Sequence, residues 1–454
     1  MRLKQKFLTA LLTFTLVLSA SVFAVPKGER NVHVNYKETK LKNGLRVITV
    51  EDHSSPVIAI DITYNVGSRN ERQGRTGFAH LFEHMMFKGS ENVGTGEHFY
   101  LIFNNGGTMN GTTNEDRTTY FEALPSNQLD LALYLEADRM RSLAINQKNL
   151  DNQRNAVQEE RRLGVDNQPY GKSNEIQQGL IYDNFAYKHT TIGSMEDLNA
   201  ATVEDVAAFF KMYYAPNNAV LTLVGDFNTA DALKKIKQNF EVIPRQPDPP
   251  SVDMTEPQQT AERRQTVDDA LARAPQVDIA FKDVPGNTPD FYALQVLAAS
   301  LAGGQSSRLY QALVKDKQLV TNIFGFQDEK RGTGAFYISA NLRPGVKTDD
   351  AESAIYAEIE RLKKDGIADW ELEKAKNTTR RNFINGLQSS LSRAIQMSVW
   401  TVYYNDPNLI NTRMDKVAAV TKEDVARVAN KYLTQTNRTV VITMPKKPAT
   451  ASAK

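Results

Sequence analysis

The chain alternates between β-prone runs and segments with helical periodicity. Residues 57–64 (VIAIDITY) indicate a strand, and residues 40–47 (KLKNGLRV) place an Asn-Gly turn between β-prone arms, which predicts a hairpin. A helix is predicted from about Thr76, because apolar residues there recur at i, i+3, i+4 and i+7. These residues are Phe78, Leu81, Phe82 and Met85. Since strands and helices are mixed, we expect the α+β fold class.

A repeat links the two halves of the sequence. The motif at 202–207 (TVEDVA) returns at 421–426 (TKEDVA), and at the same offset of 219 residues Asn218 falls on Asn437. Each copy then enters a β-prone string. The threonine that opens each copy is expected to cap a helix, and acidic residues follow it in the first turn. The pattern predicts a duplicated α/β domain. The alternative is two unrelated capped helices, each followed by a strand.

A proline-rich stretch from Pro244 to Pro257 falls between the two copies and is typical of an extended connector. The last residues, PKKPATASAK, have the composition of a disordered tail. We therefore expect a domain over 25–243, a linker over 244–262, a second domain over 263–444 and a tail over 445–454.

The N-terminus has the features of an export signal. Three basic residues precede an apolar run at 7–18, and small residues then lead to a plausible cleavage site after Ala24. The run is 12 residues long, whereas a membrane-spanning helix needs about 20. We expect residues 1–24 to be a signal peptide and the mature protein to be periplasmic or secreted, without a stable membrane span. The alternative is an uncleaved N-terminal anchor.

Composition narrows the chemistry. The 454 residues include no cysteine, which excludes thiol nucleophiles, Cys-ligated zinc and iron–sulfur clusters. There are 55 basic and 53 acidic residues, a balance that argues against nucleic acid as the main partner.

The predicted helix at residue 76 carries a second stripe, which is polar. His80, Glu83 and His84 lie about 200° around the helix from the apolar stripe, so they are expected to point away from the core. Two histidines at i and i+4 can bind one tetrahedral metal ion, with the glutamate beside it. The alternative is a polar helix face that happens to hold two of the six histidines.

A catalytic zinc site needs a third protein ligand and an open position for water. With cysteine absent, a carboxylate is expected. The segment 153–162 (QRNAVQEERR) is predicted to be helical and contains Glu159 and Glu160. These two residues are about 100° apart on a helix, so only one of them can face the metal. The spacing does not choose between them.

These motifs resemble the pitrilysin/insulinase (M16) zinc peptidases, the family that includes mitochondrial processing peptidase. His80-x-x-Glu83-His84 is similar to the inverted zinc motif of that family, and the family's downstream E-R-x-x-V-x-x-E element, laid over 153–160, selects Glu160. Further similarity lies at 106–113, 189–194, 214–218 and 303–309.

The resemblance implies two α/β roll domains per chain, joined here by the Pro-rich linker. It also implies that two such chains, or two fused pairs, close around a peptide-holding chamber. It implies one Zn2+ per chain and Glu83 as the general base of an endopeptidase. It also implies that substrate adds as a strand beside Asn110, Gly111 and Thr112.

The sequence departs from the family pattern at three positions. Gln153 stands where the family has Glu, near the metal, and removes a negative charge there. Val314 and Thr321 stand where active members carry an Arg and a Tyr that hold substrate. We therefore expect this chain to be the zinc-bearing subunit of a heterodimer, with a sibling M16 chain supplying the Arg/Tyr pair.

Two other functions are alternatives to a zinc peptidase. One is a non-catalytic core subunit of a larger complex, although such subunits usually lose the zinc motif. The other is a nucleotide-binding enzyme, suggested by Gly171-Lys172-Ser173. It is disfavoured because Asp166 replaces the glycine that a phosphate-binding loop needs.

Overall fold

The computed structural model describes residues 32–446. Its first sheet contains β1 (Lys37–Lys40), β2 (Arg46–Glu51), β3 (Val57–Tyr64), β4 (Thr108–Thr113), β5 (Thr118–Pro125) and β6 (Ala219–Gly225). The strand order is β1-β2-β6-β3-β5-β4, so β4 is an edge strand. The predicted hairpin is the antiparallel pair β1–β2, and the predicted strand at 57–64 is β3, which is buried on both faces near the sheet centre.

The second sheet contains β7 (Arg263–Asp269), β8 (Gln276–Lys282), β9 (Val320–Gln327), β10 (Ala335–Leu342) and β11 (Arg438–Pro445). Its order is β7-β11-β8-β10-β9. In each sheet the last strand of the repeat, β6 or β11, pairs parallel with one neighbour and antiparallel with the other. This shared topology confirms the predicted duplication.

The helices fall into two sets, one in each half of the chain. The first set is α1 (Phe78–Met85), α2 (Glu97–Asn104), α3 (Leu129–Arg141), α4 (Gln147–Arg161), α5 (Gly171–Ile181), α6 (Phe185–Lys188), α7 (Met195–Asn199), α8 (Val203–Tyr213) and α9 (Thr229–Phe240). The second set is α10 (Pro289–Leu301), α11 (Thr348–Asp365), α12 (Asp369–Leu387), α13 (Ser390–Tyr404), α14 (Leu409–Ala418) and α15 (Lys422–Tyr432).

The repeated motif has the same local structure in both copies. The Thr202 and Thr421 side chains cap α8 and α15, as predicted. The amide of Asn218 donates to the carbonyl of Tyr213 at 2.8 Å, and Asn437 donates to its equivalent at the same distance. Each asparagine thus ties the end of a helix to the start of the strand that follows it.

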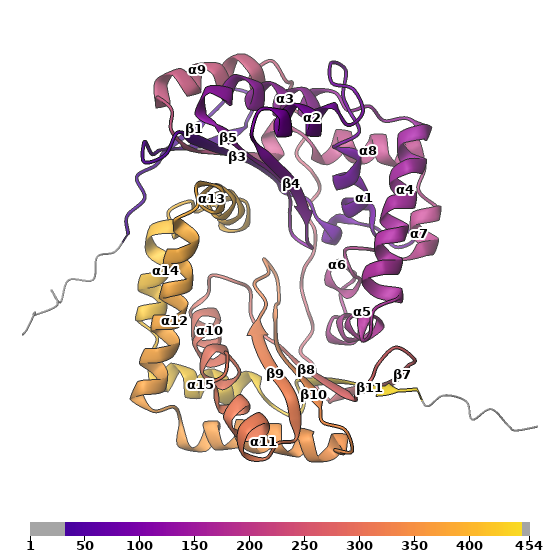
Figure 1. Cartoon of the computed structure of the whole chain (residues 1–454), viewed down its shortest axis with the longest axis vertical. Helices are drawn as coiled ribbons and strands as arrows, with labels where there is room; N and C mark the ends of the chain where they lie inside the picture. Colours follow the sequence, from indigo (N-terminus) through magenta and orange to yellow (C-terminus); the bar gives the residue numbers. More distant parts are fainter. Residues whose placement is uncertain (1–31, 447–454) are drawn as a thin grey trace, which may run out of the picture. The chain divides into compact units, whose positions relative to one another are not determined.

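Two helices cross from one half of the chain to the sheet of the other (Figure 1). The face of the first sheet that carries Ile48 and Val50 is covered by α13, through Met397 and Trp400. The second sheet is covered on one face by α10, α11 and α15, and on the other by α5. Each sheet therefore completes its burial with a helix from the other half.

Residues 244–262 form neither helix nor strand. The segment is anchored, because the carboxylate of Glu256 accepts from the backbone N–H of Asn184 at 2.9 Å and from the Lys282 ammonium at 2.9 Å. The proposed domain boundaries stay a prediction, since α5 and α13 pack across this division.

The tail was predicted to begin at Pro445, but this residue belongs to the last strand of the second sheet. Pro445 closes β11 opposite Asp269, and the N–H of Lys446 donates to the carbonyl of Asp269 at 2.9 Å. The predicted signal peptide and the rest of the tail lie outside the described residues. Within residues 32–446 no helix combines the length and apolar character that crossing a membrane requires.

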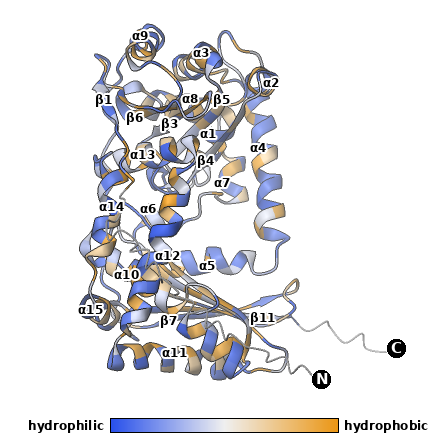
Figure 2. Ribbon diagram, turned by 60° about the vertical axis from the view of Figure 1, so that its left-hand side comes forward, coloured by the Kyte–Doolittle hydropathy of each residue, from blue (hydrophilic) through white to orange (hydrophobic). Residues whose placement is uncertain are grey.

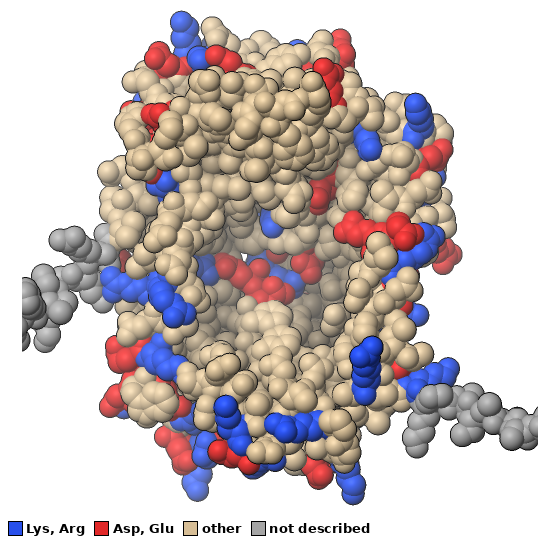
Figure 3. Space-filling view, viewed as in Figure 1, with Lys and Arg blue, Asp and Glu red and all other residues tan. Residues whose placement is uncertain are grey.

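Surface patterning follows the packing. Figure 2 shows hydrophobic and hydrophilic residues mixed along α11, which buries one side against the second sheet. Figure 3 shows acidic side chains gathered in the hollow at the middle of the face drawn, with both charges interspersed along its rim.

Candidate metal centre

Helix α1 contains the candidate metal ligands His80 and His84 and the candidate general base Glu83. Its apolar stripe is buried as predicted: Phe78, Leu81, Phe82 and Met85 all lie in the core. The helix begins at Phe78, two residues later than predicted, because Gly77 occupies the N-cap position with φ +81°, a left-handed conformation that favours glycine. Burial of the stripe fixes the rotation of α1, and His80 and His84 therefore face the neighbouring helix α4.

Three donor atoms converge between α1 and α4. Glu160 Oε2 lies 3.7 Å from His80 Nε2 and 3.3 Å from His84 Nε2. All three donor atoms lie within 4.8 Å of one another. Two donors bound to one tetrahedral zinc are about 3.3 Å apart. The two distances from Glu160 to the histidines are therefore close to the spacing of donors that share one zinc ion, and slightly longer than ordinary N–H···O hydrogen bonds.

The structure distinguishes the two glutamates that spacing left open. Glu159 turns away from the histidines and pairs with the Arg162 guanidinium at 2.9 Å. Glu160, one residue later, points at His80 and His84. The sequence could not settle this choice, because it depends on how α4 is rotated against α1.

Electrostatics suit a cation here. Burial, and then the neighbouring His84, lower the pKa of His80 to about 4, so its imidazole is neutral near pH 7, as a metal ligand requires. The hydrogen bond from His84 lowers the pKa of Glu160, which keeps that carboxylate charged. Two imidazoles and one carboxylate are a donor set typical of catalytic zinc.

Glu83 lies beside this cluster, but its environment differs from the prediction. It was expected on a face turned away from the core, whereas the edge strand β4 covers it and leaves the residue 8% exposed. Its Oε2 accepts a hydrogen bond from the Thr113 hydroxyl at 2.6 Å. Burial raises the pKa of Glu83. Thr113 was not singled out from sequence, although it shares the inward face of β4 with Gly111 at i+2.

The predicted substrate residues lie on β4. Asn110 and Thr112 are exposed, whereas Gly111 faces α1. A Cβ placed on Gly111 would lie 3.1 Å from Glu83 Cγ, so glycine permits the close approach of strand and helix. The N–H of Gly111 donates to the side-chain oxygen of Asn110 at 2.9 Å rather than to another strand.

The structure shows the surroundings of the three residues that depart from the family pattern. Gln153 is buried on α4. Its side-chain amide donates to the side-chain oxygen of the neighbouring Asn152 at 2.6 Å. Val314 is buried in the core of the second half. Thr321 lies on β9, where its hydroxyl donates to the carbonyl of Asn341 at 3.1 Å.

The segment that suggested a phosphate loop is helical. Gly171-Lys172-Ser173 opens α5, and Tyr170 precedes it in a left-handed conformation. The Ser173 hydroxyl is buried and hydrogen-bonds the Thr443 hydroxyl of β11. It is therefore not available to a nucleotide.

A second cluster of potential ligands is buried behind α1. His98, Glu122 and Glu136 bring donor atoms together. However, the Arg139 guanidinium donates to Glu136 at 3.0 Å and lies over the ring of Tyr120. A fixed cation already supplies the positive charge that a metal would bring.

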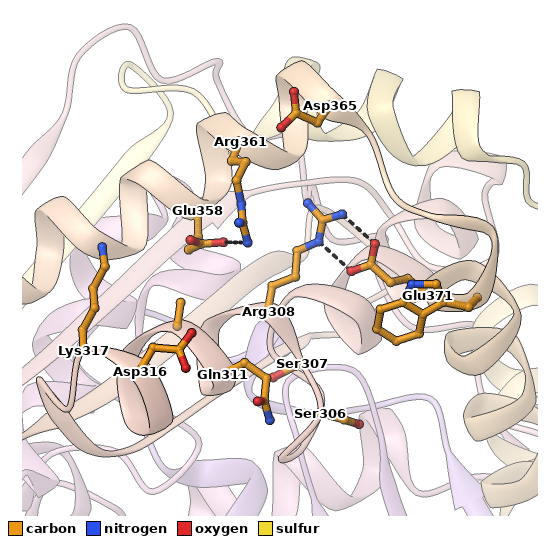
Figure 4. Close-up of a pocket in the computed structure, with 12 residues that line it drawn as sticks. Ser306, Ser307, Arg308, Gln311, Asp316, Lys317, Glu358, Arg361, Asp365 and Glu371 are labelled. Carbon is orange, nitrogen blue, oxygen red and sulfur yellow. Dashed lines mark hydrogen bonds and ion pairs between the residues drawn. The ribbon is translucent and has the colours of Figure 1, made fainter.

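A cavity of about 570 Å³ lies in the second half of the chain between the 303–309 loop, α11 and α12 (Figure 4). Arg308 and Glu371 form a two-bond pair at its wall, at 2.6 Å for each bond. Glu358 and Arg361 form a second pair. Two ion pairs thus line this cavity, which is separate from the cluster on α1 and α4.

Comparison with known proteins agrees with the geometry. The family model described as "Insulinase (Peptidase family M16)" matches residues 46–187, and "Peptidase M16 inactive domain" matches residues 200–379. The chain is 32% identical over 413 residues to a Helicobacter pylori protein named zinc protease PqqE, covering 90% of this chain and 93% of that protein.

Two further similarities extend this result. A crystal structure of a protease from Helicobacter pylori superimposes with a TM-score of 0.87 at 32% identity, covering 91% of this chain and all of that one. A probable mitochondrial-processing peptidase β subunit of Arabidopsis thaliana is 25% identical, covering 87% of this chain and 76% of that protein. This chain therefore belongs to the insulinase family, peptidase family M16.

Proposed function

We propose that this chain is a zinc-dependent endopeptidase that binds one Zn2+ through His80, His84 and Glu160. The observation that carries the proposal is the convergence of these three donor atoms within 4.8 Å, from two separate helices. The family supports it, because relatives are named zinc proteases. In the part of the chain that the structure describes, one other cluster brings three potential ligands together. It has one histidine and two glutamates, and the Arg139 guanidinium already lies against it.

Glu83 acts as general base and then as general acid. His80, His84 and Glu160 would hold a zinc ion, which would polarise the scissile carbonyl and lower the pKa of water. Glu83 Oε2 is held by Thr113, which leaves Oε1 free to take a proton from the attacking water. The same oxygen passes that proton to the leaving amide nitrogen as the peptide bond breaks. Burial raises the pKa of this carboxylate, which makes it a stronger base.

The substrate peptide binds as an added strand on the free edge of β4. In this arrangement its main chain pairs with that of residues 110–112, so recognition depends little on side chains. The Asn110 side chain, which now accepts from Gly111 N–H, is replaced by a substrate carbonyl.

A sibling M16 chain completes the active enzyme, after export to the periplasm or the exterior. Val314 has no polar group and is buried in its own core, and the Thr321 hydroxyl is short and already donates within its sheet. Neither residue can bind a substrate carboxylate or stabilise charge as an Arg/Tyr pair would. The missing groups are supplied by the partner.

The test compares purified wild type, Glu83→Gln and His80→Ala for zinc content and peptide cleavage, alone and with proteins that co-purify from the native cells. Wild type with its partner should cleave an unstructured peptide and lose activity with chelator. Glu83→Gln should keep zinc and lose at least a hundredfold in turnover, whereas His80→Ala should lose zinc. Full turnover by Glu83→Gln contradicts the mechanism. Zinc without cleavage in every mixture supports the alternative of a non-catalytic core subunit.

A further inference from the structure

The N-terminus of α1 is capped from a distance. Its N-cap residue, Gly77, has no side chain, so the first N–H groups of the helix depend on another residue. The Glu71 carboxylate, fully buried, accepts from Gly77 N–H at 3.0 Å and from Ala79 N–H at 2.7 Å. A negative charge at this end is also favoured by the helix dipole. Glu71 therefore sets where the ligand-bearing helix starts.

His189 holds Glu71 in place. Its Nε2 lies 2.9 Å from the Glu71 carboxylate and 3.0 Å from the carbonyl of Ser68, and its Nδ1 lies 2.8 Å from the carbonyl of Phe185. All three partners are acceptors. A neutral imidazole has only one N–H and would turn a lone pair toward a carbonyl oxygen. The contacts are satisfied on both sides only by the doubly protonated imidazolium.

The charged groups around His189 leave Glu71 as its counter-ion. Two further carboxylates in this region have cationic partners of their own: Glu115 pairs with Lys330, and Glu175, which accepts from the Thr190 hydroxyl, pairs with Arg161. Burial alone would lower the pKa of His189. The Glu71 carboxylate and the two carbonyls outweigh burial, and the net shift is upward.

The segment that begins at His189 also touches both ligand-bearing helices. Asp197 accepts from the N–H of Thr76 at 2.9 Å, next to the start of α1. Arg161, which follows the ligand Glu160 on α4, donates to the carbonyl of Gly193 at 2.7 Å. Residues 189–197 therefore bridge the two elements whose relative placement makes the three donors converge.

Two glycines allow this bridge to approach closely. Gly77 and Gly193 both have positive φ, +81° and +70°. A Cβ on Gly77 would lie 2.6 Å from the carbonyl oxygen of Ile192, and a Cβ on Gly193 would lie 2.4 Å from backbone atoms of Thr76 and Gly77. The two backbones are thus in direct contact, and the ion pair lies beside that contact.

We propose that the buried His189 imidazolium and Glu71 carboxylate are a positioning pair, which fixes the start of α1 against the 189–197 segment and so presents His80 and His84 to the metal. This inference rests on the proposed function, because it assigns to the pair a role in zinc binding. His189 and Glu71 contact no metal ligand side chain and act only through the backbone of α1.

The first experiment reads the charge of His189 directly. The full chain is labelled with 15N at histidine only, without added zinc, and the ring nitrogens of His189 are assigned by the loss of their signals in His189→Gln. Imidazolium shifts at pH 7, with both ring nitrogens protonated, are the expected result. A neutral ring at pH 7, with one unprotonated nitrogen, overturns the ion pair whatever the enzyme's activity.

The second experiment measures zinc affinity by chelator competition. His189→Gln is expected to weaken zinc binding about tenfold, as loss of supporting contacts around a metal ligand does. His53→Gln is the matched control, since both ring nitrogens of His53 also face acceptors, here the carboxylates of Glu51 at 3.0 Å and Asp226 at 2.6 Å, but on the surface. It should bind zinc as wild type does.

A double-mutant cycle separates an ion pair from simple packing. Adding Glu71→Gln to His189→Gln should recover part of the lost affinity, because the unpaired buried charge is removed. Effects that simply add, or unchanged affinity in His189→Gln, overturn the proposal. If wild type itself binds no zinc, the proposed function fails instead, and the NMR result still decides the charge state of His189.

Discussion

The contact between Gly111 and Glu83 gives a sharp test of the active-site geometry. In Gly111→Ala the new Cβ would lie 3.1 Å from Glu83 Cγ and 3.2 Å from its Oε1. Ordinary carbon–carbon contacts begin at about 3.5 Å, so the Glu83 side chain must move by a few tenths of an ångström. Since misplacement by about 1 Å can cost a hundredfold in rate, we expect kcat to fall about tenfold, or ~1.4 kcal/mol.

The assay measures kcat, zinc content and melting temperature on the same preparation. Zinc should remain bound, because the added methyl group meets Glu83 and Tyr120 but none of the three ligands. Gly164→Ala is the matched control, because a Cβ at that position has no neighbour within 4 Å. Wild-type kcat in Gly111→Ala, or a fall in rate that is explained by loss of zinc, would refute the placement of Glu83 against β4.

Three further predictions follow from individual contacts. Gln153→Glu should strengthen zinc binding about tenfold in chelator competition, since it adds a negative charge to α4 about two turns before Glu160; weaker binding would show that the amide is preferred there. His98→Gln should leave one zinc per chain by metal analysis, because Arg139 already neutralises the buried cluster; loss of bound zinc would reveal a second site. Asn218→Ala and Asn437→Ala should each lower the free energy of unfolding in urea by about 1–2 kcal/mol, by leaving equivalent helix-end carbonyls unpaired. The two losses should add in the double variant, since the residues precede strands of different sheets.

The pattern of apolar and polar residues along the chain was sufficient to predict the helices that hold the candidate metal ligands. The apolar spacing of Phe78, Leu81, Phe82 and Met85 predicted α1 and its buried face, because helical geometry alone relates these positions. The repeat at 202 and 421 predicted two capped helices that lead into equivalent strands, since capping is also local.

Contacts between distant segments were beyond the sequence. Glu83 was expected on an open face, but the edge strand β4 covers it, and no periodicity in α1 reports that cover. The role of Glu71 in capping α1 from the preceding turn was likewise not visible, because its pairing with His189 spans more than a hundred residues. Local spacing specifies a helix face, whereas tertiary packing decides what lies against it.

The packing of equivalent helices in the two copies explains why the candidate metal ligands lie in only one of them. In the first copy the helix after the central antiparallel strand is α1, which buries one stripe and keeps histidines on the other. In the second copy the helix that follows β8 is α10, which is buried nearly all round, from Phe291 to Leu301. A helix enclosed by α12, α14 and α15 has no face left for a cation and its water. The second copy therefore contributes core and an inter-half helix, α13, and all three candidate metal ligands come from the first copy.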